Sequence, residues 1–301
     1  MLDHARIFHV NVNCSDLERS RAFYVDGCGL GDGARTTPER TQPGTAFGLD
    51  RARWDAWILV GTQGFDGGAV DLLEWQEPAP TGTPPHALTE AGFQRVGLSV
   101  RDLDHAIEQA AALGGTVWSD PNVHHAPGGN DIRIVFVSDP DGTALELVEG
   151  DGRGLLFVAV TCVDLVRSVA FYWSLGFEEL ARFGSAHESG AHLRVDGPVA
   201  MQEVLMGAPD GHVHLLLAAF EEPAARPSSP RPANALGIWR VALLVPDLDD
   251  AVAALRGAGI ALLSEPAAMA MGPGLPELRF VCFRGPDQEV IELIEQPNVT
   301  A

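Results

Sequence analysis

One histidine stands at a repeated position that the chain otherwise fills with other residue types. It is His9, in the stretch FHVNVNCSDLERSRAFY, which is copied as FVAVTCVDLVRSVAFYW from Phe157 onward. Two shorter copies, RVGLSVRDLDHAI and RVALLVPDLDDAV, begin at Arg95 and Arg240. An imidazole can ligate a divalent metal or exchange a proton near neutral pH, whereas a guanidinium keeps its charge and cannot ligate. His9 is therefore the candidate for chemistry.

Each copy is organised to place such a residue on a strand that leads into a helix. It opens with an alternating apolar strand such as HVNVNC or RVALLV. An aspartate then precedes a leucine, which is typical of a helix N-cap, because the carboxylate accepts an unpaired backbone N–H. These aspartates are Asp16, Asp102, Asp164 and Asp247. The helix ends near glycine and further strand-like runs follow, so each copy predicts strand–helix–strand–strand–strand.

The four copies are separated by linkers and form two similar halves. Segments 76–92 and 221–237 are rich in proline and small residues, and 149–154 is a short joint with three glycines. The sequence thus predicts two domains, residues 1–150 and 151–301, each made of two modules. The modules span about residues 5–76, 93–149, 155–220 and 237–296.

This order of elements resembles the vicinal oxygen chelate superfamily, which includes glyoxalase I, bleomycin-resistance proteins, extradiol dioxygenases and fosfomycin-resistance enzymes. The resemblance is carried by HVNVNCSDLERSRAFY, DPDGTALELVE, FVAVTCVDLVRSVAFY and EVIELIE, and it covers nearly the whole chain. It implies an α+β fold in which four βαβββ modules pair into two glyoxalase-like domains, whose curled mixed sheets enclose clefts. Two pairings stay open: module one with two and three with four, or module one with four and two with three.

The same resemblance implies a divalent ion in the cleft, held by residues of the opening and closing strands. The opening-strand positions are His9, Arg95, Phe157 and Arg240. The closing-strand positions are Asp71, Glu146, Glu292 and, in the third module, His214. If modules one and two pair, then His9, Asp71 and Glu146 would ligate Fe, Mn, Ni or Zn.

Arginine at two of the four opening-strand positions argues against that metal. A guanidinium would repel a divalent cation and would pair with a carboxylate instead. This predicts the ion pair Arg95–Glu146, with bidentate geometry, in the second module and Arg240–Glu292 in the fourth. Phe157 and Arg240 also replace the histidines that the resemblance requires of an extradiol dioxygenase, which is therefore disfavoured. We expect no cofactor, with the three-residue metal site as the alternative.

Further residues are candidates for contact with a ligand or for proton transfer. They are His125, His214, Phe157, Phe47, Trp57, Arg95, Arg240 and Glu292. His125 lies in a loop rich in glycine and proline, where members of the superfamily contact substrate, and His214 could act as a base. Phe47 and Trp57 would give a cleft the aromatic walls that suit a planar or apolar molecule.

Composition limits the partners and the compartment. The formal net charge of −21 disfavours a nucleic-acid partner, and no apolar run approaches the ~18 residues of a membrane span. The first ten residues lack the pattern of a signal peptide, so we expect cytoplasmic residence. Four cysteines without CxxC spacing indicate no zinc site or disulfide framework. The expected partner is a small molecule, with aromatic compounds among the candidates, and the expected state is a monomer or homodimer.

Three kinds of function follow from these observations. A lyase- or isomerase-type enzyme would use His9 and nearby acids without metal. A ligand-binding protein of the bleomycin-resistance type would need no catalytic group, and a degenerate member with a regulatory or structural role would need no ligand. The metal-dependent form of the first kind, a lyase or dioxygenase, would use His9, Asp71 and Glu146 as ligands. The two arginines favour metal-free action or binding.

Overall fold

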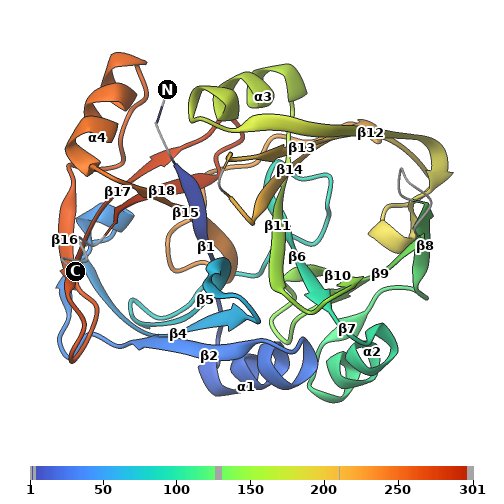
Figure 1. Cartoon of the computed structure of the whole chain (residues 1–301), viewed down its shortest axis with the longest axis horizontal. Helices are drawn as coiled ribbons and strands as arrows, with labels where there is room; N and C mark the ends of the chain where they lie inside the picture. The colour runs from blue at the N-terminus through green and yellow to red at the C-terminus, as the bar shows by residue number, and fades with distance from the viewer. Residues whose placement is uncertain (1, 3–4, 126–130, 210, 297–301) are drawn as a thin grey trace.

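The chain folds around two mixed β-sheets of nine strands each, which lie side by side in Figure 1. The computed structural model describes residues 2, 5–125, 131–209 and 211–296. In the first sheet the strand order is β16-β17-β18-β15-β1-β5-β4-β2, with β3 paired to β4. In the second sheet it is β12-β13-β14-β11-β6-β10-β9-β7, with β8 paired to β9. The α+β fold of curled mixed sheets is as the sequence predicts.

The strands of the first sheet come from the two ends of the chain. They are β1 (Arg6–Asn13), β2 (Gly31–Thr36), β3 (Gln42–Pro43), β4 (Arg51–Gly61), β5 (Gly64–Glu77), β15 (Gly237–Val245), β16 (Ala267–Ala270), β17 (Glu277–Arg284) and β18 (Val290–Glu295). The antiparallel pairing of β1 with β15 joins them. The first sheet therefore combines the first module with the fourth.

The second sheet combines the second module with the third. Its strands are β6 (Gly92–Val100), β7 (Thr116–Val117), β8 (Asn122–His125), β9 (Asp131–Ser138), β10 (Ala144–Glu149), β11 (Gly154–Thr161), β12 (Glu178–Ser189), β13 (Pro198–Gly207) and β14 (His214–Glu222). β11 and β6 pair antiparallel at its centre. Of the two pairings that the sequence leaves open, the structure has one-with-four and two-with-three. The boundary near residue 150 marks the repeat, and each sheet draws on both halves.

The described residues form four α-helices, which are α1 (Leu17–Ala22), α2 (Leu103–Ala112), α3 (Leu165–Ser174) and α4 (Leu248–Gly257). The π-helix η1 (Phe23–Gly27) continues α1, and the 3₁₀ turns η2 (Thr45–Phe47) and η3 (Gly190–Leu193) lie between strands. Each α-helix begins after the predicted aspartate, whose side chain accepts the backbone N–H three residues on. These N-caps are confirmed. No helix in the described part of the chain is long and apolar enough to span a membrane.

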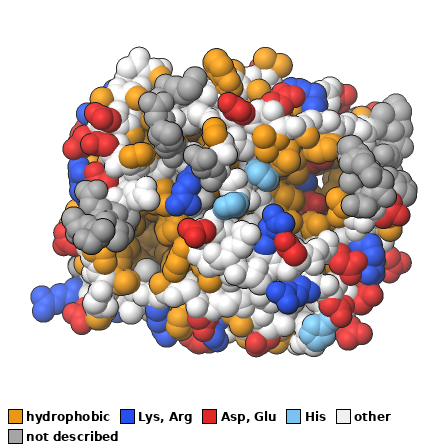
Figure 2. Space-filling view, in the orientation of Figure 1, with side chains coloured by type: hydrophobic (Ala, Val, Ile, Leu, Met, Phe, Trp, Pro, Cys, Tyr) orange, Lys and Arg blue, Asp and Glu red, His pale blue; other side chains and the backbone are white. Residues whose placement is uncertain are grey.

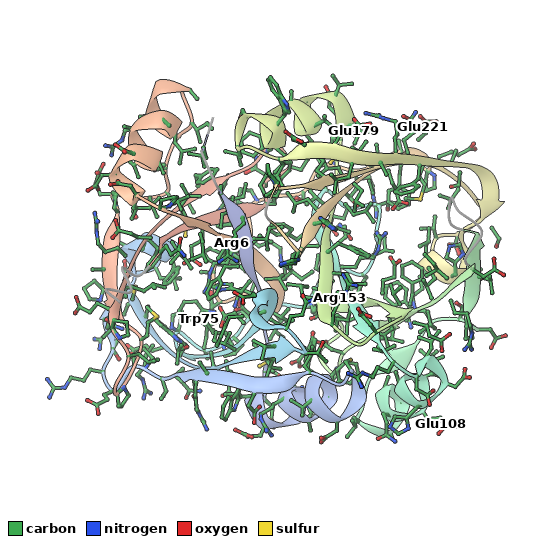
Figure 3. The ribbon with its side chains drawn as sticks, in the orientation of Figure 1. Arg6, Trp75, Glu108, Arg153, Glu179 and Glu221 are labelled. Atoms are coloured by element: carbon green, nitrogen blue, oxygen red, sulfur yellow. The ribbon has the colours of Figure 1, made fainter. Side chains whose placement is uncertain are left out.

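Apolar side chains fill the space between the sheets and helices and also line the concave side of each sheet. One cluster takes in the helices and both sheets, including Phe23, Tyr24 and Tyr172. A second cluster belongs to the first sheet and contains Trp75, which Figure 3 places in the interior of that half of the molecule. A third belongs to the second sheet. The concave sides are therefore where a site can form.

Two buried tyrosines join modules that lie in different sheets. Tyr24 donates a hydrogen bond to Asp139 Oδ2 at 3.1 Å, and Tyr172 donates one to Glu289 Oε1 at 2.8 Å. Burial raises the pKa of Asp139 to about 6 and that of Glu289 to about 7. Both carboxyl groups lie in the tight turns that join the last two strands of the even modules. These turns thus fix each odd module against its neighbour in the sequence.

The Glu289→Gln variant is expected to remove part of the pH dependence of folding stability. A folded-state pKa of about 7 against an ordinary 4.5 means that stability is present at low pH and is lost as pH rises between these values. The difference corresponds to roughly 3 kcal/mol. Urea unfolding at pH 5 and pH 8 should show the variant more stable than the parent at pH 8 and equal to it at pH 5. The exposed substitution Glu277→Gln is the control, and an unchanged slope in Glu289→Gln would contradict the assignment.

Candidate functional site

Four polar side chains meet on the concave side of the first sheet, on its four central strands. They are His9 on β1, Asp71 on β5, Arg240 on β15 and Glu292 on β18, and none is more than 6% exposed. Strand register brings them together. Asn11 faces Arg240 across one ladder and Asp71 across the other, and Glu292 lies beside Ala242. Since alternate residues of a strand point to one side, these positions share a face.

The Arg240 guanidinium divides its donors between the two acids. Nη2 donates to Asp71 Oδ2 at 2.8 Å, and Nε donates to Glu292 Oε2 at 2.9 Å. Burial lowers the pKa of Arg240, but Glu292 and Asp71 outweigh it, so the pKa lies above its ordinary value. Burial raises the pKa of Glu292, but Arg240 and His9 outweigh it, so that pKa is lowered. The group is a buried, mutually stabilised set of ions.

The His9 imidazole lies against the same two acids without being hydrogen-bonded to them. Its Nε2 is 3.5 Å from Glu292 Oε2 and 3.7 Å from Asp71 Oδ2. Within the described structure neither ring nitrogen of His9 has a hydrogen-bond partner, and the same holds for Arg240 Nη1. Buried polar atoms are seldom left unpaired in folded proteins. Unpaired donors and acceptors on two neighbouring side chains therefore indicate a place for a ligand.

An apolar cavity of about 230 Å³ lies directly over this group. Its aromatic lining consists of Phe8, Phe47, Trp54, Phe65 and Phe280. Figure 2 shows a hollow with mainly hydrophobic walls in the left half of the molecule, which is the half that Figure 1 assigns to the first sheet. A concave apolar pocket with a few convergent polar groups at its base is the usual form of a small-molecule site. We call it the first-sheet cleft.

The second sheet carries a related group with a different composition. Arg95 on β6 donates through Nε to Glu146 Oε2 at 2.7 Å and through Nη2 to Glu203 Oε1 at 3.1 Å. Asp71 has no acidic counterpart on β14, because Ala159 faces both Arg95 and Leu216, as Asn11 faces both Arg240 and Asp71. Glu203, on the neighbouring strand β13, supplies the second carboxylate instead.

Phe157 stands at the position of His9 and packs against the backbone of the second sheet. A Cβ placed on Gly97 would lie 2.3 Å from the Phe157 ring. The Arg95 guanidinium lies 5.9 Å from this ring and 5.6 Å from that of Phe136. The second sheet therefore uses an aromatic side chain where the first has its imidazole. The two sheets share the arginine and one acid but differ in the residue that could do chemistry.

Comparison with known proteins agrees with this architecture. The sequence profile of the Glyoxalase/Bleomycin resistance protein/Dioxygenase superfamily matches residues 6–147 and 154–293. The chain belongs to this superfamily. The crystal structure of glyoxalase I from Zea mays superimposes with a TM-score of 0.64 at 19% sequence identity and covers 97% of this chain and 92% of that one. At that identity the likeness establishes the fold alone.

Curated relatives named lactoylglutathione lyase match about half of this chain. Lactoylglutathione lyase GLX1 of Arabidopsis thaliana is 27% identical over 173 residues, which is 56% of this chain and 54% of the relative. A lactoylglutathione lyase of Salmonella typhimurium is 28% identical over 152 residues, which is 50% of this chain and 98% of the relative. The chain spans about half the length of the plant relatives that it matches.

The metal set that the resemblance implies is not assembled. His9 and Asp71 belong to the first sheet, whereas Glu146 belongs to β10 of the second, because module one pairs with four. In the first-sheet cleft the oxygens nearest His9 are Asp71 Oδ2 and Glu292 Oε2, and both already accept from Arg240. Among the described residues no cluster of three or more His, Cys, Asp or Glu is suited to hold a metal ion. These residues do not fit the divalent ion of the superfamily.

The two predicted ion pairs, Arg95–Glu146 and Arg240–Glu292, are present. The bidentate geometry expected for Arg95 with Glu146 is absent, because each guanidinium contacts two different carboxylates. His214 also needs correction. It faces Phe157 at the start of β14, two residues before Leu216, which takes the closing-strand position. Burial and, to a smaller extent, the neighbouring basic side chains of Arg153 and His212 lower the pKa of His214.

The nominated aromatic and loop residues have mixed outcomes. Phe47 lines the first-sheet cleft. Trp57 does not, because β4 turns it to the opposite side, where Arg21 and Arg35 lie over its ring at 5.2 and 5.1 Å. Trp54, three residues earlier, lines the cleft instead. His125 lies on β8 opposite Asp131, and its side chain is outside the described part of the structure.

Sequence reasoning missed Glu203 and Trp54. Strand alternation in RWDAWILV places Trp54 with Ala56 and Ile58 and against Trp57, so the pattern contained the signal for one side of β4. The pattern did not indicate which side of β4 faces the concave side of the sheet. No sequence pattern points to Glu203. It pairs with Arg95 where β14 has Leu216 in place of an acid.

Proposed function

We propose that the first-sheet cleft is a small-molecule site that works without a resident metal and in which His9 exchanges a proton with the ligand. Arg240 is the observation that carries this proposal. Its guanidinium donates to the two carboxylate oxygens that lie nearest His9 Nε2. A divalent ion would need those oxygens and would lie beside a fixed positive charge. Arg240 supplies positive charge in the cleft without offering a coordination site.

The arrangement suits lyase- or isomerase-type chemistry at a carbon next to a carbonyl group. A ring nitrogen of His9 takes the proton from that carbon, and the electron pair moves onto the carbonyl oxygen. Arg240 stabilises the negative charge on this oxygen by N–H donation, and the carboxylates of Asp71 and Glu292 stabilise the imidazolium. Return of the proton to a neighbouring atom completes an isomerisation, and departure of a leaving group completes an elimination. The curated relatives named lyases support this reaction class.

A ligand-binding protein without catalysis is the second candidate. The observation that favours it is the cavity wall, which is almost entirely apolar and aromatic and can hold a molecule with no chemical step. The His9→Ala variant separates the two candidates. In both cases the affinity for the ligand stays within about twofold. In an enzyme the variant lowers the rate of turnover by roughly 10²-fold or more, whereas a binding protein has no turnover to lose.

Binding of a hydrocarbon probe tests the site itself. Ethylbenzene, followed by tryptophan fluorescence and calorimetry, should bind equally before and after exhaustive dialysis against EDTA. Ile58 lines the cavity, and Ile58→Trp should reduce the affinity by at least about tenfold by filling it. The control is Leu205→Trp, because Leu205 faces Leu216 in the second sheet as Ile58 faces Asp71 in the first. Loss of binding on EDTA treatment, or an unaffected Ile58→Trp, would contradict the proposal.

A further inference from the structure

We infer that the ligand of the first-sheet cleft is an uncharged molecule with a single aromatic ring and a carbonyl oxygen that accepts from Arg240 Nη1. This inference rests on the proposed function and narrows it. It also separates this chain from the relatives named after a glutathione thioester. Size, charge and the unpaired donor each support it.

The volume of the cleft limits the part of the ligand that it encloses to about one ring and a short substituent. A cavity of about 150 Å³ lined by aliphatic and aromatic side chains binds benzene. At about 230 Å³ the first-sheet cleft has room for a few heavy atoms more. A glutathione conjugate carries a whole tripeptide in addition to its acyl group. That tripeptide would have to lie outside the cavity.

The charges at the base of the cleft disfavour an anion. The two carboxylates of Asp71 and Glu292 face a single guanidinium, so the buried group carries one net negative charge apart from His9. Arg240 is the only arginine or lysine in the cavity lining given by the described residues, and it already has two ion pairs. An anionic ligand would meet these carboxylates in a poorly solvated place, where like charges repel strongly. A neutral acceptor avoids that repulsion.

The unpaired donor defines where the ligand oxygen lies. Arg240 is 6% exposed, and within the described structure its Nη1 has no hydrogen-bond partner although Nη2 and Nε do. The guanidinium lies 5.5 Å from the Phe47 ring and 5.7 Å from the Trp239 ring, which hold its plane. A carbonyl oxygen on Nη1 would satisfy the donor.

The mouth of the cleft is apolar as well. Phe65 and Leu275 both line the cavity, and they are among the large hydrophobic side chains that remain exposed, at 41% and 38%. They lie on β5 and in the loop before β17, so they approach the cavity from two segments far apart in the sequence. Exposed apolar side chains at the rim of a pocket are suited to cover an apolar ligand body. The ring of the ligand would therefore extend from the base toward this rim.

Four probes, each measured by calorimetry, test the inference on the full chain: acetophenone, ethylbenzene and benzoate, which are matched in shape, and the much larger S-hexylglutathione. Acetophenone should bind at least about tenfold more tightly than ethylbenzene, since a buried charged donor gains its acceptor. Benzoate and S-hexylglutathione should bind more weakly than acetophenone. Equal affinities for acetophenone and ethylbenzene would refute the hydrogen bond from Arg240 Nη1 to the ligand, while leaving the cavity as a binding site. Preference for benzoate would refute the charge argument, and preference for S-hexylglutathione would refute the size argument.

The Arg240→Lys variant tests the hydrogen bond from Arg240 Nη1 to the ligand directly. Lysine keeps the charge between the two acids but has no second donor on a planar fork. The preference for acetophenone over ethylbenzene should fall to within about twofold, while ethylbenzene affinity is retained and reports an intact cavity. Arg279→Lys is the control, because Arg279 lies on β17 of the same sheet and pairs with Asp249 and Glu295 outside the cavity. If Arg240→Lys does not fold, the order of the four probes in the parent protein decides. Failure of ethylbenzene and acetophenone alike would overturn the proposed site instead.

Discussion

The Arg240→His variant is expected to bind one divalent cation per chain. Removing the guanidinium takes its N–H donors away from Asp71 Oδ2 and Glu292 Oε2, which lie within 3.7 Å of His9 Nε2, and leaves Asn11 Nδ2 as a donor to Asp71. A second imidazole at that position would complete a set of two histidines and two carboxylates, which suits Zn, Ni or Fe. We expect micromolar affinity or better, which corresponds to about −8 kcal/mol. Titration calorimetry and elemental analysis measure it.

Arg95→His is the matched control for this gain of metal binding. In the second sheet Phe157 stands at the position of His9 and Leu216 at that of Asp71, so the new imidazole would have only Glu146 and Glu203 beside it. It should gain no comparable affinity. A folded Arg240→His variant that binds no cation would show that something other than the guanidinium keeps metal from the first-sheet cleft.

The Arg240→Leu variant is expected to lose about 3–5 kcal/mol of folding stability at neutral pH, as when one partner of a buried ion pair is removed. The change leaves Asp71 and Glu292, both less than 4% exposed, as neighbouring buried carboxylates with no guanidinium between them. The loss should be smaller at pH 4, because protonation removes their repulsion. Urea unfolding at both pH values measures it.

Neutralising the acids should restore most of what Arg240→Leu removes. Adding Asp71→Asn and Glu292→Gln to it removes both unpaired charges while keeping their shapes. A triple variant no more stable than Arg240→Leu would contradict the electrostatic explanation and point to lost packing against Phe47 and Trp239. Recovery of stability would show that the two unpaired carboxylates, and not lost packing, account for the effect of Arg240→Leu.

The repeat was the part of the fold that could be predicted, because each module carries its own local signals. The aspartate N-caps, such as Asp16 and Asp164, depend only on residues a few positions away, and they occur as predicted. The ion pairs Arg95–Glu146 and Arg240–Glu292 also join strands of one module. Interactions within a module were thus accessible from the sequence.

What the sequence could not determine depends on how the modules meet. Similar modules present similar edges, so nothing in β1 alone selects β15 over β6 as its partner, and the pairing decides that His9 meets Glu292 and not Glu146. Strand register caused the second failure. A shift of two residues on β14 separates His214 from Leu216, and both fit an alternating pattern.

The comparison of the two sheets explains why one cleft is the candidate site. Both hold an arginine between carboxylates, which indicates that the ion set serves the fold in each. In the first sheet His9 and an apolar cavity lie beside this group, whereas in the second sheet Phe157 occupies the position of His9 and packs on Gly97. The ionic group is therefore common to both sheets, whereas the first sheet alone, among the described residues, joins it to His9 and the apolar cavity.

Elemental analysis of the unsubstituted protein tests the central claim, that Arg240 takes the place of a divalent metal. The protein is produced in medium supplemented with Fe, Mn, Ni and Zn, purified without chelators and compared with His9→Ala prepared in parallel. We predict far less than one equivalent of any of these metals, with no difference between the two proteins. A near-stoichiometric amount that disappears on His9→Ala would contradict the account.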